Sequence, residues 1–92
     1  MNLDSKIVLV GTPVSVARKV NKKDNTVYLL IQFLQRDNET GEVKLFDVKV
    51  EQAYLHNFNE IEEGKQVQIE ILIKTFQNQM FIRGIRLLKI AK

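Results

Sequence analysis

Apolar residues recur at strand spacing through most of this 92-residue chain. In the clearest run, Val67, Ile69, Ile71 and Ile73 alternate with residues expected to face outward. Because successive side chains of a strand point to opposite faces, the pattern predicts a half-buried strand with these four residues inward. A chain patterned in this way must bury its apolar faces by packing sheet against sheet, which indicates an all-β fold.

Four further runs of β-branched, aromatic and aliphatic residues are bounded by polar turn clusters. They are Lys6 to Val20, Thr26 to Gln35, Glu42 to Val50 and Met80 to Ile90. Pro13 cannot donate to a strand ladder, so the long first run should bulge or lie at an edge near residues 11–13. Gly84 breaks the alternation of the last run, which predicts a bulge or a close backbone approach there.

One stretch departs from strand spacing. Tyr54, Leu55, Phe58 and Ile61 recur at helical spacing, which predicts one short helix within Gln52 to Ile61. Three strands, a helix and two strands in one domain of residues 1–92 are the order of a five-stranded OB-type barrel, with the helix between strands 3 and 4. From the pattern alone, another small barrel or an open β-sandwich remains an alternative.

Composition excludes most chemistry. The chain has no cysteine and one histidine, so neither a disulfide framework nor a zinc site is expected. Its four glycines are isolated and form no phosphate loop, and the dense carboxylates Glu60, Glu62 and Glu63 follow the helix as a solvated turn. We therefore expect no catalytic residue, no metal, no cofactor and no small-molecule substrate.

The sequence shows no run apolar enough for a membrane helix and no signal-peptide order at its start. We therefore expect a cytoplasmic protein with no membrane contact.

Charge is unevenly distributed along the chain, although the net charge is only +3. Residues 1–23 hold five basic and one acidic side chain, residues 64–92 hold six and one, and residues 24–63 hold three and nine. If barrel closure brings the two ends together, the basic segments merge into a patch suited to a phosphate backbone. A surface of mixed charges is the alternative from charge alone.

Two segments resemble bacterial single-stranded DNA-binding proteins. The opening Ser5 to Gly11 is similar to their first strand, and Gly64 to Glu70 followed by Lys74-Thr75 is similar to their fourth. The part from Ile73 to Lys92 resembles the end of the helix-destabilising proteins of filamentous phages.

The resemblance implies a non-catalytic OB-fold protein that coats or protects single-stranded DNA during replication or recombination. The chain lacks the tryptophans and the long acidic-tipped tail of the bacterial proteins. That difference favours a phage-, plasmid- or primosome-type relative. The alternative function is an OB-fold protein-interaction module of a replication or recombination complex, and an enzyme is not expected.

Single-strand binding needs aromatic faces for bases and a basic groove for the backbone. We expect Tyr28 and Phe76 to stack on bases, because Tyr28 lies opposite the core-facing residues of its strand and Phe76 lies at a turn. Structural roles are expected for Phe46, Tyr54 and Phe58, and a place in the core or in a subunit interface for Phe33 and Phe81.

The basic candidates gather near the two loops that clamp ligands in OB domains. Lys44 and Lys49 are expected on the exposed face of the third strand, and only the first of these enters the site. The predicted nucleic-acid contacts are Arg18, Lys19, Lys22, Lys23, Tyr28, Lys44, Lys74, Phe76, Arg83 and Arg86. Solubilising charge is the interpretation for Lys6, Lys65, Lys89 and Lys92.

Assembly is predicted from a surplus of apolar residues. Residues 7–10, 27–34 and 85–88 are apolar on both faces of their strands, whereas a small barrel can bury only one. Contiguous apolar surface usually marks an interface, so we expect a homodimer or a higher even oligomer.

Overall fold

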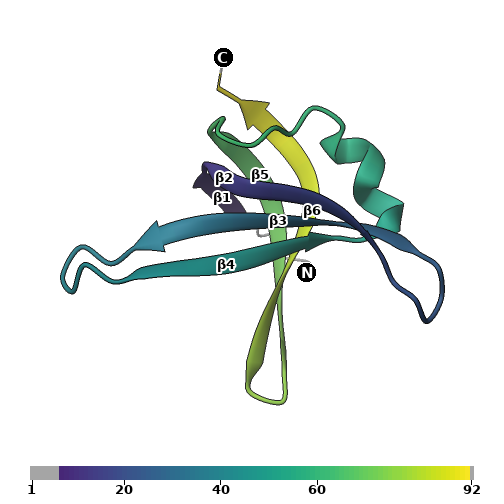
Figure 1. Ribbon diagram of the computed structural model, residues 1–92, viewed down its shortest axis with the longest axis horizontal. Helices are drawn as coiled ribbons and strands as arrows, with labels where there is room; N and C mark the ends of the chain where they lie inside the picture. Colours follow the sequence, from purple (N-terminus) through teal and green to yellow (C-terminus); the bar gives the residue numbers. More distant parts are fainter. Residues whose placement is uncertain (1–6, 92) are drawn as a thin grey trace, which may run out of the picture.

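The computed structural model describes residues 7–91 and contains six strands and one short 3₁₀ helix (Figure 1). The elements are β1 (Ile7–Gly11), β2 (Pro13–Val20), β3 (Val27–Arg36), β4 (Val43–Val50), η1 (Gln52–Phe58), β5 (Val67–Phe76) and β6 (Gln79–Ile90). No helix within this range is long and apolar enough to cross a membrane.

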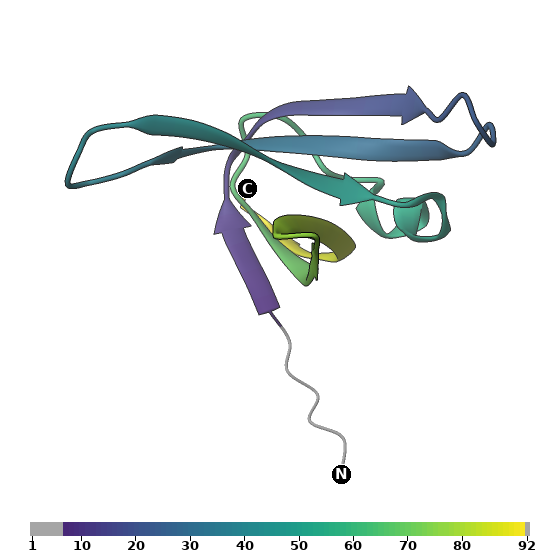
Figure 2. The same cartoon turned by 90° about the horizontal axis from the view of Figure 1, so that it is seen from below.

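The strands form one sheet in the order β1-β5-β6-β4-β3-β2. All neighbours are antiparallel except β4 and β6, which run parallel and meet at the pair Lys49 and Arg83. Figure 2 shows β2, β3 and β4 side by side, with β1, β5 and β6 crossing them. The OB-type architecture is confirmed, although hydrogen bonds do not close the sheet into a barrel, because β1 and β2 at the two ends of the order do not pair with each other. The helix η1 lies between β4 and β5, which are the third and fourth strands of the predicted order.

The strand count is six rather than five because the first strand is broken at Thr12. β1 and β2 stand at opposite ends of the hydrogen-bonded order and are joined through this one residue. Pro13 has no N–H to donate, the register shifts between Pro13 and Ser15, and the Pro13 carbonyl accepts from the Gly64 N–H at 2.9 Å. The predicted irregularity near residues 11–13 is confirmed.

The core is built from alternate residues of β3, β4 and β5, as their period-2 pattern requires. The buried apolar side chains are Leu29, Ile31, Phe33, Val48, Val50, Phe58, Val67, Ile69 and Ile71. Phe46 is half-buried and its ring stacks on that of Phe33, with centroids 5.4 Å apart. The structural roles expected for these two phenylalanines are confirmed.

Two predictions of burial are wrong. Ile73 is exposed, because β5 and β6 continue past the barrel as a free hairpin that has no sheet beneath it (Figure 1). Tyr54 is exposed because η1 is a 3₁₀ helix, in which residues three apart share a face, so Leu55 and Phe58 face the core and Tyr54 does not. The helix ends at Phe58, three residues before the predicted end, and Phe58 is its one buried residue. A helix this short presents only one narrow face to the barrel.

Gly84 meets both predictions made for it. The β5–β6 register shifts between Glu70 and Ile71, the latter opposite Gly84, so β6 bulges beside this glycine. A Cβ at residue 84 would lie 2.9 Å from Cγ2 of Val50 and 3.0 Å from Cζ of Phe58. The missing side chain is therefore what lets β6 pack closely against β4 and η1.

Candidate nucleic-acid interface

The sheet face that points away from the core carries aromatic rings and cations on four neighbouring strands. Strand register fixes which residues share this face: Lys49 is paired with Leu30 and Arg83, Arg83 with Leu72, and Lys74 with Phe81. We call this set the outer band, and it consists of Tyr28, Lys49, Arg83, Phe81, Lys74 and Phe76. The band runs from the β2–β3 turn towards the tip of the β5–β6 hairpin.

Cations and rings are in contact within the outer band. The Lys49 ammonium lies 4.7 Å from the centroid of the Tyr28 ring, and the Arg83 guanidinium carbon lies 5.5 Å from that of Phe81. A cation over an aromatic face is attracted by the ring quadrupole. Each pair thus holds a positive charge over one face of a ring, and so brings together a cation that can contact a phosphate and a ring whose other face can contact a base.

Two carboxylates partly neutralise the arginines of β6. Oε1 of Glu51 lies 3.4 Å from Nε of Arg83, and Oε1 of Glu70 lies 3.1 Å from Nε of Arg86. Both distances are those of ion pairs, yet neither pair has the alignment of a hydrogen bond. One partner of each pair, Glu51 and Arg86, is about half exposed, so solvent screens the pair and a phosphate can compete with the carboxylate for the guanidinium.

The basic residues near the first turn do not all face the same way. Lys19 is paired with Tyr28 and so shares the face of the outer band, and Lys22 and Lys23 are exposed in the turn itself. Arg18 is paired with Leu29 and lines a small cleft with Phe58 at the η1 end of the barrel. Arg18 therefore lies on the other side of β2 from the band.

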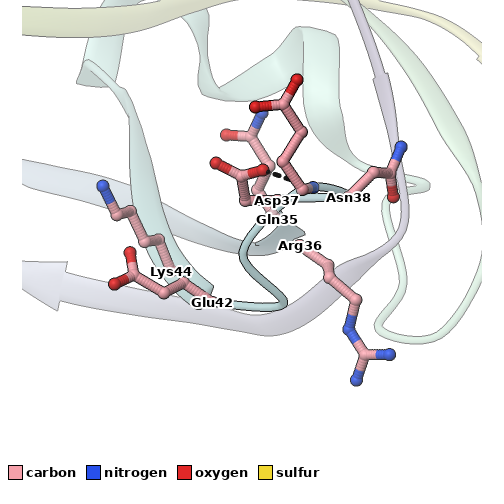
Figure 3. Close-up of a pocket in the computed structure, with 7 residues that line it drawn as sticks. Gln35, Arg36, Asp37, Asn38, Glu42 and Lys44 are labelled. Atoms are coloured by element: carbon pink, nitrogen blue, oxygen red, sulfur yellow. Dashed lines mark hydrogen bonds between the residues drawn. The ribbon is translucent and has the colours of Figure 1, made fainter.

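The expectation that Lys44 shares an exposed face with Lys49 is wrong. Lys49 lies five positions after Lys44, an odd number, so a regular strand points the two side chains to opposite faces. Lys44 is paired with Gln35 beyond the barrel and lines a polar cleft of about 520 Å³ in the β3–β4 hairpin, together with Glu42 (Figure 3). Carboxylates outnumber cations in this cleft.

Two residues of the outer band were missed as site residues in the sequence. Lys49 was recognised as exposed but was not included, and Phe81 was assigned to the core or to an interface. The signal for Phe81 is its spacing of two from Arg83, which places both on one face of β6. Lys6 and Lys92, interpreted as solubilising charges, lie outside the described residues.

Asp24 lies in the turn that follows β2. The Thr26 hydroxyl and backbone N–H both donate to its Oδ1, at 2.6 and 3.1 Å. The hydroxyl bond, which contributes most, and the backbone bond hold the pKa of Asp24 below its ordinary value. Asp24 is therefore ionised at neutral pH, and it brings a negative charge to the Tyr28 end of the outer band.

An apolar groove opens on another side of the barrel. It has a volume of about 490 Å³ and lies between β1, the β3–β4 hairpin and the β5–β6 hairpin. We call it the apolar groove; its lining is Ile7, Val8, Leu9, Val10, Gly11, Phe33, Leu34, Gln35, Phe46, Ile71, Ile73, Met80 and Ile82. Several of these side chains are exposed, and β1 stands at the end of the strand order with one edge unpaired among the described strands.

No family model and no curated protein sequence matches the chain. Its fold is similar to that of the mitochondrial single-stranded DNA-binding protein Rim1 from S. cerevisiae. In one crystal structure of Rim1 the identity is 17%, 98% of each chain is covered and the TM-score is 0.66. In another, the identity is 20%, the coverage is 98% and 100%, and the TM-score is 0.57.

A small single-stranded DNA-binding protein from Mycoplasma pneumoniae is also similar. It shares 12% identity over 95% of this chain and 94% of its own, with a TM-score of 0.55. At these identities the likeness is one of fold. It confirms, at that level, the resemblance to OB-fold single-stranded DNA-binding proteins that the sequence indicated.

Proposed function

We propose that this chain is a non-catalytic cytoplasmic protein that binds single-stranded DNA and coats or protects it during replication or recombination. The observation that carries the proposal is the outer band, in which three rings and three cations lie on one face across β3, β4, β6 and β5 between two hairpin turns. We also propose that residues 1–92 form one domain, and residues 7–91 present one such face.

The outer band suits single strands for two physical reasons. Its cations can neutralise successive phosphates of a backbone and displace the counterions condensed on them. Because the release of counterions is more favourable when the salt concentration is low, association is strongest at low salt. Its rings offer π-faces to bases, and each stacked base contributes about 1 to 3 kcal/mol. In a duplex the bases are already stacked and paired, so the rings have nothing to contact.

The contacts we propose are the outer band itself with Lys19, Lys22, Lys23 and Arg86. Arg18 and Lys44 face away from the band, so we expect little from either. The structural neighbours Rim1 and the Mycoplasma protein are single-stranded DNA-binding proteins, which supports the same assignment.

We expect affinity for a fluorescent oligo-dT to fall steeply with salt, because each neutralised phosphate contributes about −0.7 to the log–log slope. A duplex of the same length should bind much more weakly at every salt concentration. Fluorescence anisotropy from low to moderate salt measures both. Binding that ignores salt, or equal affinity for duplex and single strand, contradicts the proposal.

A protein-interaction module is the second candidate function, and the apolar groove is the observation that favours it. A groove of exposed aliphatic side chains beside a free strand edge suits a protein surface better than it suits DNA. If no oligonucleotide binds at low salt while the chain is folded, this function takes precedence.

We propose that the apolar groove and the free edge of β1 join two copies into a homodimer, or into a higher even oligomer. Val10→Glu should then shift the protein towards monomer in sedimentation equilibrium, since a buried charge without a partner is costly. Val20→Glu is the control, because Val20 is 57% exposed against 56% for Val10 but does not line the groove. A wild-type monomer at micromolar concentration contradicts the proposal.

A further inference from the structure

The two ion pairs of β6 differ in which partner faces solvent. At Arg83 the carboxylate is the outer partner, since the Glu51 side chain is 51% exposed and that of Arg83 is 23% exposed. At Arg86 the order is reversed, and the better-buried partner is Glu70. Glu70 therefore anchors an arginine that already reaches solvent, whereas Glu51 covers an arginine that does not.

Arg83 lies beside a second cation at the one point where β4 meets β6. It is the register partner of Lys49, and both residues belong to the outer band. Like charges on neighbouring positions repel, so a carboxylate next to them stabilises the free protein. Glu51 supplies this carboxylate, and it lines a polar cleft of about 300 Å³ together with Lys49.

The carboxylate leaves the donors of the Arg83 guanidinium largely unused. Nε lies 3.4 Å from Oε1 of Glu51 but makes no hydrogen bond, and Nη1 donates only to the Ile82 carbonyl, at 3.5 Å. No other hydrogen bond to this group comes from residues 7–91. A phosphate can take two parallel N–H donors of a guanidinium at once, so it can form a stronger contact here than Glu51 does.

Only the side chain of Glu51 has to move to free the guanidinium. Its carbonyl accepts the Tyr54 N–H at 2.9 Å, and the Gln52 side chain accepts a backbone N–H of β3 at 2.8 Å, so the backbone here is fixed. The half-exposed carboxylate can rotate into water at little cost. The Arg83 guanidinium keeps its contact with the Phe81 ring, 5.5 Å from its carbon to the ring centroid.

We propose that Lys49 and Arg83 form a phosphate subsite of the outer band, and that Glu51 occupies this subsite in the free protein as an internal competitor. This inference rests on the proposed function and deepens it. A phosphodiester of single-stranded DNA takes the place of the carboxylate, which turns into solvent and regains a counterion. The exchange lowers both the affinity for the strand and the net release of counterions, so it favours dissociation.

The test is a double-mutant cycle of Glu51→Gln and Arg83→Gln, with affinity for (dT)₈ measured by fluorescence anisotropy. Glu51→Gln should bind about two- to five-fold more tightly than the wild type at low salt, the equivalent of one weak ion pair. Its log–log salt slope should be steeper by up to about 0.7. In the Arg83→Gln background the gain should fall to the general effect of removing one negative charge.

Asp47→Asn measures that general effect. Asp47 lies two residues before Lys49 on the same face of β4, and its Oδ1 accepts from the Gln32 side-chain amide at 3.0 Å, as an asparagine oxygen can. Its gain should be smaller than that of Glu51→Gln and equal in both backgrounds. The subsite is overturned, with single-strand binding left standing, if Glu51→Gln gives no gain, a gain that Asp47→Asn matches, or a gain that persists in full without Arg83. A wild type that does not bind (dT)₈ at low salt overturns the proposed function and the subsite with it.

Discussion

Phe76→Ala is expected to weaken binding of a short oligo-dT by about 5- to 150-fold, the equivalent of one lost base stack. Phe76 lies at the tip of the β5–β6 hairpin and is 66% exposed, so it contributes little to the core. It shares the face of Lys74, two residues earlier on the same strand, and a stacked base would bring its phosphate near that ammonium. Anisotropy titrations at low salt measure the loss, and the melting temperature should stay unchanged.

The matched control for this prediction is Met80→Ala. Met80 is 63% exposed on the same hairpin, but it is paired with Thr75 and therefore points to the opposite face from Phe76. Truncating it should leave the affinity for an oligonucleotide short enough for one chain unchanged, and Phe76→Tyr should retain most of the binding. Equal losses from Phe76→Ala and Met80→Ala would show that the tip binds through general hydrophobic contact rather than through a stacked ring.

The fold was predictable where one local rule acts alone. Alternation at Val67, Ile69 and Ile71 fixed a buried face of β5, because a strand buried on one side must repeat every two residues. Pro13 fixed the break in the first strand, because it cannot donate to a ladder. These signals need no knowledge of what lies across the sheet.

Prediction failed where burial depends on how far an element extends. Ile73 continues the alternation of Ile71, yet β5 has by then left the barrel and has only β6 beside it. Tyr54 and Phe58 have the spacing that shares a face of an α-helix, but η1 is a 3₁₀ helix, in which residues four apart point in different directions. Nothing in the spacing records the point at which a strand or helix loses its partner.

The candidate site was half predictable for a related reason. Tyr28 and Phe76 could be assigned from their own strand and turn. The centre of the outer band depends on the parallel contact of β4 with β6, which joins Lys49 to Arg83 at one position and brings Glu51 to the same guanidinium. Neither partner carries a local signal of that contact. The error for Lys44 was avoidable. Its odd spacing from Lys49 along one strand already shows that the two side chains point to opposite faces.

Phe58→Ala is expected to lower the free energy of unfolding by about 3 to 5 kcal/mol, the usual cost of truncating a buried phenylalanine. Phe58 is 2% exposed, and its ring tip occupies the space that the absent side chain of Gly84 leaves open. For a domain whose total stability is roughly 5 to 15 kcal/mol, the loss is a large fraction. Urea unfolding followed by circular dichroism measures the loss. Phe58→Leu should lose less stability than Phe58→Ala, and it replaces the alanine variant in this measurement if that variant is largely unfolded.

Tyr54→Ala separates this core contact from the aromatic content of η1. Tyr54 is 37% exposed, so its truncation should cost well under half as much as that of Phe58. The Phe58 variant should also disturb the outer band, because η1 is tied to β6 by the Asn57 side-chain amide, which donates to the Ile85 carbonyl at 3.0 Å. Loosening η1 frees the segment of β6 that carries Arg83, and oligo-dT affinity should fall in Phe58→Leu but not in Tyr54→Ala. Equal stability losses in Phe58→Ala and Tyr54→Ala would contradict the packing of η1 described above.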